Sequence, residues 1–383
     1  MKIKVLLLAF AQLLMFSLTS HSEEKCHDGD FWHKWFKESQ FIGFGNIPSQ
    51  NQIANAQLDR ANQFFSGKSL TKDYSKAIAL YKKAARNGIH EANFNLGLMS
   101  HYGKGRLVSY QEAYDYYYKS ALKNNPEAQF NLGLIERYGL GRPKNFESAF
   151  AWFEKASRKQ VSLDRYQCKE IREGLVEAQY NLAQMYHYGL GVNKNLSYAA
   201  MLYELAAKQG MKEAQFNIAQ ILHYGPSEMQ NLQKAYRWYL KAANQNVLEA
   251  EFNLGLMHHY GRGTQQDYVL ARQHYLKAVQ ADIAEADLNL GFLYYYGLGV
   301  PTDPSIAFKY FKIASKKDLP QAHYHLGLIY KNGNGVEKDD IAANQWFKRA
   351  SSLGVIEASL MLNDISIRES KIKLQPSKEE LKS

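Results

Sequence analysis

Histidine side chains that could transfer protons or bind a metal ion recur along this 383-residue chain immediately before a tyrosine. The residue at this place changes from copy to copy, in the order His101, Arg137, His187, His223, His259, Tyr295 and Lys331. The sequence contains no GxSxG motif, no HExxH motif and no suitable arrangement of cysteine with histidine. Aspartate and glutamate are abundant, but they follow the phase of a repeat. We therefore predict that the protein is not an enzyme, and we turn to the elements that carry these residues.

A pattern of fifteen residues recurs along the chain at a nearly constant spacing. It reads EAQFNLGLIERYGLG at 127–141 and EAEFNLGLMHHYGRG at 249–263. Its alanine is found as Ala56, Ala92, Ala128, Ala178, Ala214, Ala250, Ala286, Ala322 and Ala358. Every interval is 36 residues except the interval from Ala128 to Ala178, which is 50. A fourteen-residue insertion close to residues 161–174 therefore interrupts a regular array.

Each unit of the array contains two stretches with helical periodicity, and neither alternates as a half-buried strand would. The first stretch ends at a tyrosine followed by glycine, as in Tyr102-Gly103, and the second is exemplified by AYDYYYKSA at 113–121. We predict a helix A, a turn capped by glycine in the left-handed conformation, and a helix B. Without a GxxxxGK[ST] motif or a preceding strand, these glycines do not indicate a phosphate-binding loop.

Two positions of the repeat accept only small residues. In helix A they are Gly97, Gly133, Ala183, Ala219, Gly255, Gly291 and Gly327. In helix B they are Ala77, Ala113, Ala149, Ala199, Ala235, Ala271, Ala307 and Ala343. A position that stays small in every copy predicts a close approach of two helices, because a larger side chain would overpack the contact.

The repeated pattern resembles that of the Sel1-like repeat family, a relative of the tetratricopeptide repeat. The resemblance is carried by A-x-x-N-L-G-x-x-Y-x-x-G-x-G followed by A-x-x-W/Y-x-x-K-A-A-x-x-G, with full examples at 178–210 and 322–354. It covers residues 54–356 in eight units. It implies an all-α fold, a right-handed α-solenoid (superhelix) of stacked helix-turn-helix repeats. The fifth unit departs from the pattern at Gly225-Pro226-Ser227, which predicts a different local turn.

The ends of the chain differ in composition from the array. Residues 1–22 have a basic start and a short apolar stretch, which predicts a secretory signal peptide, with a retained N-terminal anchor as the alternative. Residues 23–53 contain an aromatic helical stripe that would cap the first repeat or anchor the protein to a membrane surface or a partner. We predict a C-terminal capping helix at 357–366 and a charged, disordered tail at 367–383.

Charge and cysteine content restrict the partners. The formal net charge is +10, and loss of Lys2 and Lys4 with the signal peptide would leave about +8. Because the basic residues are scattered, they form no stripe that would bind nucleic acid, and any contact with a membrane surface would be weak. Cys26 and Cys168 lie outside the repeats. In an exported protein they could form a disulfide or remain free thiols, and a thiol count on unreduced, denatured protein would decide.

The resemblance also implies where a partner would bind, because helix A lines a concave groove in tetratricopeptide-like arrays. The residues expected in this groove are His101, Phe130, Leu134, Arg137, Tyr138, Tyr180, Gln184, His187, Tyr188, Phe216, Gln220, His223, Tyr224, Phe252, His259, Tyr260, Tyr295 and Lys331. The tyrosine that ends helix A barely varies, so we predict that it is mainly structural and that its variable neighbour recognises the partner. The asparagine of the FNL segment, as in Asn131, could clamp a peptide, but a bond to the neighbouring repeat is favoured.

Tyrosine and histidine with occasional arginine suit the recognition of a protein or peptide. Stacked helix pairs lie about 10 Å apart, so His187, His223 and His259 are too far apart to share a metal ion. His258 and His259 should point to different faces of one helix. We expect neither metal nor cofactor.

The resemblance to exported Sel1-like proteins of intracellular bacterial pathogens implies a function in host-cell entry or virulence. The chain would be a non-enzymatic scaffold, periplasmic or secreted, that binds a host or envelope protein. The alternative is a periplasmic adaptor that regulates a cell-wall enzyme. A secreted hydrolase acting on wall material is a third reading.

Overall fold

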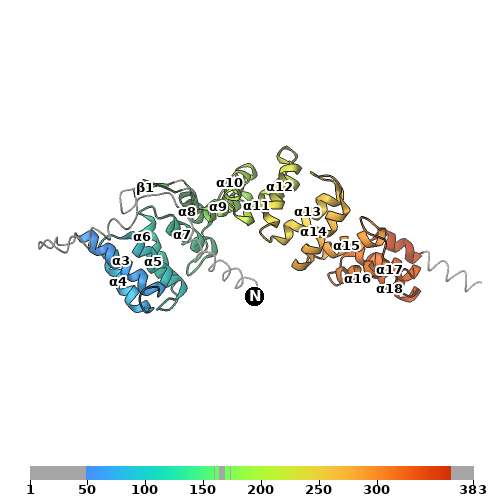
Figure 1. Ribbon diagram of the computed structural model, residues 1–383, viewed down its shortest axis with the longest axis horizontal. Helices are drawn as coiled ribbons and strands as arrows, with labels where there is room; N and C mark the ends of the chain where they lie inside the picture. The colour runs from blue at the N-terminus through green and yellow to red at the C-terminus, as the bar shows by residue number, and fades with distance from the viewer. Residues whose placement is uncertain (1–48, 159, 164–168, 173, 364–383) are drawn as a thin grey trace, which may run out of the picture. The chain divides into compact units, whose positions relative to one another are not determined.

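The computed structural model describes residues 49–158, 160–163, 169–172 and 174–363. The predicted signal peptide, the aromatic stripe, both cysteines and the tail at 367–383 lie outside these ranges. The chain forms two units, one within Met1–Lys123 and Arg158–Glu173 and the other within Asn124–Ser157 and Gly174–Ser383. Figure 1 shows each unit as a succession of helices, in blue to teal for the first and in green to red for the second.

The first unit contains helices α3 (Gln50–Ser66), α4 (Tyr74–Arg86), α5 (His90–Tyr102) and α6 (Tyr110–Ala121). Helix α3 begins with a capping box, in which the Ser49 hydroxyl accepts from the Gln52 N–H and the Gln52 side chain accepts from the Ser49 N–H. Each helix packs against the next, which buries Leu58, Tyr81 and Leu96 in one core. These two helix pairs are consecutive repeats of the predicted kind.

The insertion forms a pair of antiparallel strands, β1 (Gln160–Leu163) and β2 (Lys169–Arg172), with Val161 opposite Ile171. These two short strands lie in the insertion, and the rest of the described chain is built from helices, as expected of an all-α fold. The segment lies outside the repeated phase, so no helix pairing dictates its conformation, and QVSL in β1 alternates polar with apolar residues as a strand does.

The second unit consists of six further helix pairs. Helix A of each pair is α7 (Pro126–Tyr138), α9 (Val176–Tyr188), α11 (Lys212–Tyr224), α13 (Leu248–Tyr260), α15 (Ala284–Tyr296) and α17 (Pro320–Asn332). Helix B is α8 (Phe146–Ser157), α10 (Leu196–Lys208), α12 (Leu232–Ala243), α14 (Tyr268–Ala278), α16 (Pro304–Ser315) and α18 (Asp340–Ser352). Two short 3₁₀ helices, η2 (Ser227–Met229) and η3 (Val279–Ala281), lie in connections. Residues 356–363 are helical and pack through Ala358 against the core that contains Phe347. This arrangement confirms the predicted α-solenoid of helix pairs.

Capping residues fix where the helices begin and end. Helix B usually starts at an asparagine or aspartate, such as Asn195, Asp303 or Asp339, whose side chain accepts a hydrogen bond from the first turn. Helix A usually ends at a left-handed glycine. Gly225 instead has an extended backbone, with φ −69° and ψ −175°, and leads through Pro226 into η2. The fifth repeat therefore has a different turn, as its sequence predicted.

The small residue of helix A packs directly against an aromatic ring of helix B. A Cβ atom built on Gly255 would lie 2.5 Å from Cδ1 of Tyr275, and one on Gly291 would lie 2.6 Å from Cδ1 of Phe311. Both rings are fully buried. The close approach of helices predicted at this position is confirmed, and the aromatic ring of helix B is what requires it.

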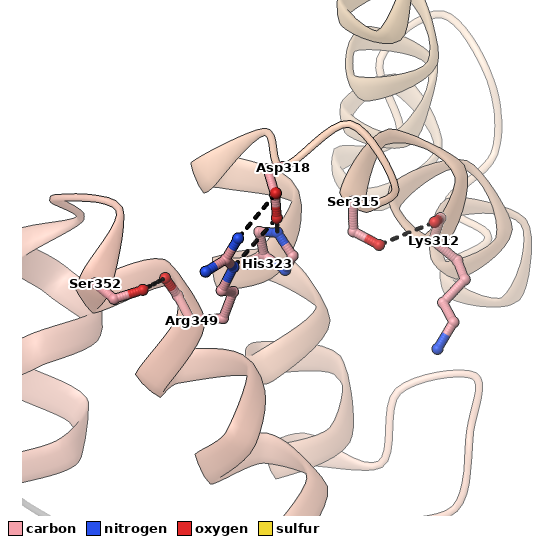
Figure 2. Close-up of polar contacts among 6 residues, drawn as sticks. All are labelled: Lys312, Ser315, Asp318, His323, Arg349 and Ser352. Carbon is pink, nitrogen blue, oxygen red and sulfur yellow. Dashed lines mark hydrogen bonds and ion pairs between the residues drawn. The ribbon is translucent and has the colours of Figure 1, made fainter.

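Side chains also connect each repeat of the second unit to the next. In the turn after helix B one residue has a positive φ, as at Asn246, Asp282 and Asp318, a conformation in which asparagine and aspartate are tolerated. Figure 2 shows Asp318 in the turn between α16 and α17. Its carboxylate forms an ion pair with Arg349 of α18 at 2.8 Å and lies 3.2 Å from Nε2 of His323 of α17. Asp282, which is equivalent to Asp318 one repeat earlier, forms an ion pair with Lys317.

Candidate functional site

The tyrosines that end helix A are the most exposed aromatic residues at any repeated position of the second unit. We call Tyr138, Tyr188, Tyr224, Tyr260 and Tyr296 the tyrosine row; they are 55%, 63%, 55%, 56% and 56% exposed. Each lies just before the turn, on α7, α9, α11, α13 and α15 in succession. In the first unit, Tyr102 occupies the same place on α5 and is 41% exposed. These residues present ring surface to solvent at one fixed position of the repeat.

The structure buries most of the histidines at the variable position that was predicted to recognise the partner, and it leaves the rings of the neighbouring tyrosines exposed. His101, His223 and His259 are at most 9% exposed, so they cannot be the principal contacts of a partner. Phe130, also expected in the groove, is 2% exposed and belongs to the core. The reason is helical geometry, because successive residues are rotated by about 100°. Tyr188, one position after His187, lies against the histidine ring and keeps its own ring exposed.

The variable neighbour is matched to the aromatic residue of helix B. The hydroxyl of Tyr117 lies 3.4 Å from Nδ1 of His101, and Tyr275 lies 3.4 Å from Nδ1 of His259. Tyr203 and His187 make the same contact at 3.5 Å. Where helix B has phenylalanine instead, as at Phe153, Phe311 and Phe347, helix A has Arg137, Tyr295 and Lys331. From the second repeat on, the type of residue at this position therefore depends on whether helix B carries tyrosine or phenylalanine.

His223 is an exception among these pairs. Neither ring nitrogen of His223 has a hydrogen-bond partner in the structure, and the facing hydroxyl of Tyr239 has none either. The two rings are 5.9 Å apart. Burial lowers the pKa of His223, and the nearby Arg262 lowers it further. Burial also lowers the pKa of His101 to about 4 and lowers that of His259, so these imidazoles are neutral near pH 7.

The near-constant asparagine of helix A makes a hydrogen bond to the preceding repeat at Asn181, Asn217 and Asn253. The hydroxyl of Tyr224 donates to Oδ1 of Asn253 at 2.9 Å. Arg137 donates to Oδ1 of Asn181 at 2.6 Å. In the last repeat, where histidine replaces asparagine, the hydroxyl of Tyr296 lies 3.0 Å from Nε2 of His325. The predicted bond to the neighbouring repeat is thus present, and it holds members of the tyrosine row in a fixed orientation.

The other residues expected to bind a partner lie on the helices A of the second unit. Leu134, Arg137, Tyr180, Gln184, His187, Phe216, Phe252, Tyr295 and Lys331 are half-buried, and Gln220 is exposed. The Tyr180 hydroxyl accepts from Gln184 at 3.0 Å and from Asn217 of the next repeat at 3.2 Å. Arg137 and Arg262 lie 5.6 Å from the ring centres of Tyr138 and Tyr260, which places positive charge beside the row.

A polar cluster between α12, α13 and α14 was not predicted. Glu251 accepts from Nζ of Lys277 at 2.9 Å and lies 2.6 Å from Nδ1 of His274. His274 stacks on His258, whose Nε2 lies 3.2 Å from the hydroxyl of Tyr236. His258 and His259 thus face different neighbours, as predicted. The sixth repeat carries a signal for this cluster in its sequence. Glu251 stands where the two preceding repeats have Gln179 and Gln215, and His274 stands where other repeats have tryptophan.

The described residues contain no group of three or more histidine, cysteine, aspartate or glutamate side chains placed to hold a metal ion. None of the described helices is both long enough and apolar enough to span a membrane.

Comparison with known proteins places these features in a family. The model of the Sel1 repeat matches residues 54–89, 90–125, 126–161, 176–211, 212–247, 248–282, 284–319 and 320–355. The strand β2 and most of the insertion fall in the gap between the third and fourth matches. A search of curated proteins finds no match.

Solved structures give the same answer for the fold. The protective antigen c5321 of uropathogenic Escherichia coli, described as having an SLR fold, superimposes with a TM-score of 0.70 at 26% identity, covering 89% of this chain and 68% of that one. A Sel1 repeat protein of Oxalobacter formigenes gives 0.53 at 24% identity, covering 90% of this chain and 95% of the other. With eight matched repeats that occupy most of its length, the chain belongs to the Sel1 repeat family.

Proposed function

We propose that this chain is an exported, non-enzymatic scaffold that binds a partner protein along the tyrosine row. Proteins built from Sel1 repeats generally serve as scaffolds for protein–protein interaction. The observation that carries the proposal for this chain is the tyrosine row, in which five consecutive repeats each expose more than half of a tyrosine at the same position.

The physical case rests on preorganisation. Tyrosine offers a large amphipathic surface with few rotatable bonds, and it is enriched among residues that dominate binding energy. Tyr224 and Tyr296 are already held by hydrogen bonds to Asn253 and His325 of the following repeats. A partner that contacts these rings would therefore lose little further side-chain entropy on binding.

The export and the host-directed role are supported by two further observations. The composition of residues 1–22 is that of a secretory signal peptide. A structure to which this chain is similar is that of a protective antigen of a pathogenic bacterium. Together they favour a partner met outside the cytoplasm, in the host or in the envelope.

Replacing Tyr188, Tyr224 and Tyr260 together with alanine is expected to weaken partner binding about 100-fold, because three central rings of the row are removed at once. The mature chain would be used to capture proteins from host lysate and from envelope extract, and the dissociation constant of each captured protein measured by titration. Tyr198→Ala is the matched control, since Tyr198 is an exposed tyrosine of helix B outside the row. Equal capture by the triple variant and the unchanged chain would refute the binding surface.

Fractionation of producing cells separates the two sources of partner. Chain found beyond the outer membrane, together with capture from host lysate, supports the host-directed role. Chain retained in the periplasm, with capture only from envelope extract, supports the adaptor that regulates a cell-wall enzyme.

A further inference from the structure

Three central members of the tyrosine row each rest on a histidine. The ring of His187 stacks on Tyr188 with centres 4.6 Å apart, and His223 stacks on Tyr224 at 3.9 Å. His259 lies against Tyr260 at 4.6 Å. At one end of the row the residue beneath Tyr138 is Arg137, which does not titrate near neutral pH. The row therefore contains rings supported by a titratable group and a ring that is not.

The opposite side of each imidazole faces helix B and offers no negative charge. His187, His223 and His259 face the hydroxyls of Tyr203, Tyr239 and Tyr275, whose pKa values are raised by burial, so that these hydroxyls stay neutral. Tyr268 of α14 also meets His259, edge-on at 5.2 Å. Among the described residues, the histidines in ion pairs with carboxylates are His90, His274 and His323.

Positive charges lie near two of the three histidines. Burial lowers the pKa of His187, and Lys194 lowers it further. Arg262 acts in the same direction on His223. Arg137 of α7 lies near the Tyr203 hydroxyl that faces His187, and its charge opposes the rise that burial causes in the pKa of Tyr203. A proton taken up by His223 or His259 would thus be a buried positive charge without a counter-ion, and one taken up by His187 would be half-buried. Each would lie beside a neutral tyrosine, and His187 and His223 would also lie near a cation.

The direction of the pH effect follows from linkage. A histidine whose folded pKa lies below its unfolded value of about 6.5 destabilises the folded arrangement only when protons become available. The packed arrangement is fully favoured above about pH 6.5 and loses stability as the pH falls below it. Because the tyrosine ring covers one face of the imidazole, exposing the protonated imidazole to water requires the tyrosine to move.

We propose that the tyrosine row is an acid-sensitive binding surface, in which protonation of His187, His223 and His259 displaces Tyr188, Tyr224 and Tyr260 and releases the partner. This rests on the proposed function for the partner, but the displacement of the rings stands on the contacts alone. Release would occur in mildly acidic surroundings, and Tyr138 at the end of the row would stay in place.

Hydrogen exchange tests the displacement without any partner. Amide protection at the C-terminal turns of α9, α11 and α13 would be compared at about pH 7.5 and about pH 5, with correction for the intrinsic rate. We expect protection to fall about tenfold or more in these three turns, and to stay within about twofold in the last turn of α7. An equal fall in α7 would mean general acid unfolding and would overturn the proposal.

A paired variant copies a solution that the chain itself uses in its seventh repeat, where Tyr295 faces Phe311. It combines His187→Tyr with Tyr203→Phe, His223→Tyr with Tyr239→Phe, and His259→Tyr with Tyr275→Phe. We expect this variant to keep its protection at about pH 5. A second variant, with the three histidines changed to glutamine, asks the same question with smaller substitutions. If a folded variant of either kind loses as much amide protection at about pH 5 as the unchanged chain does, the proposal is overturned.

His323→Gln is the matched control, because His323 is a buried histidine of α17 that lies outside the row and contacts Asp318. It should leave the acid response of α9, α11 and α13 unchanged.

Release is then measured on the lysate proteins whose capture at about pH 7.5 is lost when Tyr188, Tyr224 and Tyr260 are changed to alanine. At about pH 5 their retention should fall about tenfold on the unchanged chain and persist on the paired variant. If no protein shows this tyrosine dependence, the proposed function fails, while the exchange experiment still decides the acid response. Retention that falls equally on both chains would contradict the release.

Discussion

Changing Gly255 to leucine is expected to lower the free energy of unfolding of the second unit by about 3 kcal/mol. Even a single Cβ atom at this position would lie 2.5 Å from the ring of Tyr275, which is fully buried between its neighbours. A leucine must therefore push α13 and α14 apart, which also opens the contacts of Leu254 and Met257 in the adjoining core. Urea denaturation followed by far-ultraviolet circular dichroism would measure the loss.

Two further substitutions separate overpacking from other effects of the change. Gly255→Ala should cost much less, because Ala183 and Ala219 fill the same place in the fourth and fifth repeats, against Tyr203 and Tyr239. Gln220→Leu adds a leucine at an exposed position of α11 and should be nearly neutral. A Gly255→Leu chain that unfolds at the same urea concentration as the unchanged chain would show that the helices do not approach closely here.

Changing Gly191 to alanine is expected to destabilise the second unit by about 3 to 4 kcal/mol, from two causes that add. The residue has φ +67°, a conformation that L-residues rarely adopt. Its Cβ would also lie 2.4 Å from the carbonyl carbon of Phe146, the first residue of α8 in the preceding repeat. Because the collision is with backbone, no side-chain rotation relieves it, and the two repeats must separate. Thermal and urea unfolding would measure the loss.

Gly210→Ala is the matched control for the backbone conformation. Gly210 has φ +97°, but an added Cβ would meet no atom within 4 Å. It should therefore show the cost of the left-handed conformation alone, about 1 kcal/mol. Equal losses for Gly191→Ala and Gly210→Ala would mean that the second glycine of the turn has no packing role against the preceding helix B.

The sequence predicted the scaffold well because the same physical requirement is repeated in every copy. Small residues in helix A and alanines in helix B indicated close packing, and Tyr275 and Phe311 explain it. What the sequence alone did not reveal was which aromatic ring occupied each contact. The packing role of Gly191 against the preceding repeat was also missed, since its proximity to Phe146 depends on how two repeats stack.

The proposed tyrosine row lies on the helices A that the sequence indicated, but burial does not fit the role predicted for the variable residue. Constancy of the tyrosine indicates a structural role, which the bond from the Tyr224 hydroxyl to Asn253 supports, but the constancy does not reveal that the ring stays exposed. Variation of the preceding residue was interpreted as partner recognition, whereas His259 is matched to Tyr275. The pairing of histidine with tyrosine, and of other residues with phenylalanine, was visible in the sequence and could have revealed this.

Hydrogen bonds that run from one repeat to the next have a consequence for how such a chain can change length. Tyr224 supplies a donor to the following repeat, and Asn253 supplies the acceptor for the preceding one. A 36-residue module copied in tandem would bring both halves of this link with it, so each new junction would reproduce an existing one. Duplication or removal of whole modules inside the array should therefore be tolerated, whereas a cut at any other phase would leave unmatched partners at the seam.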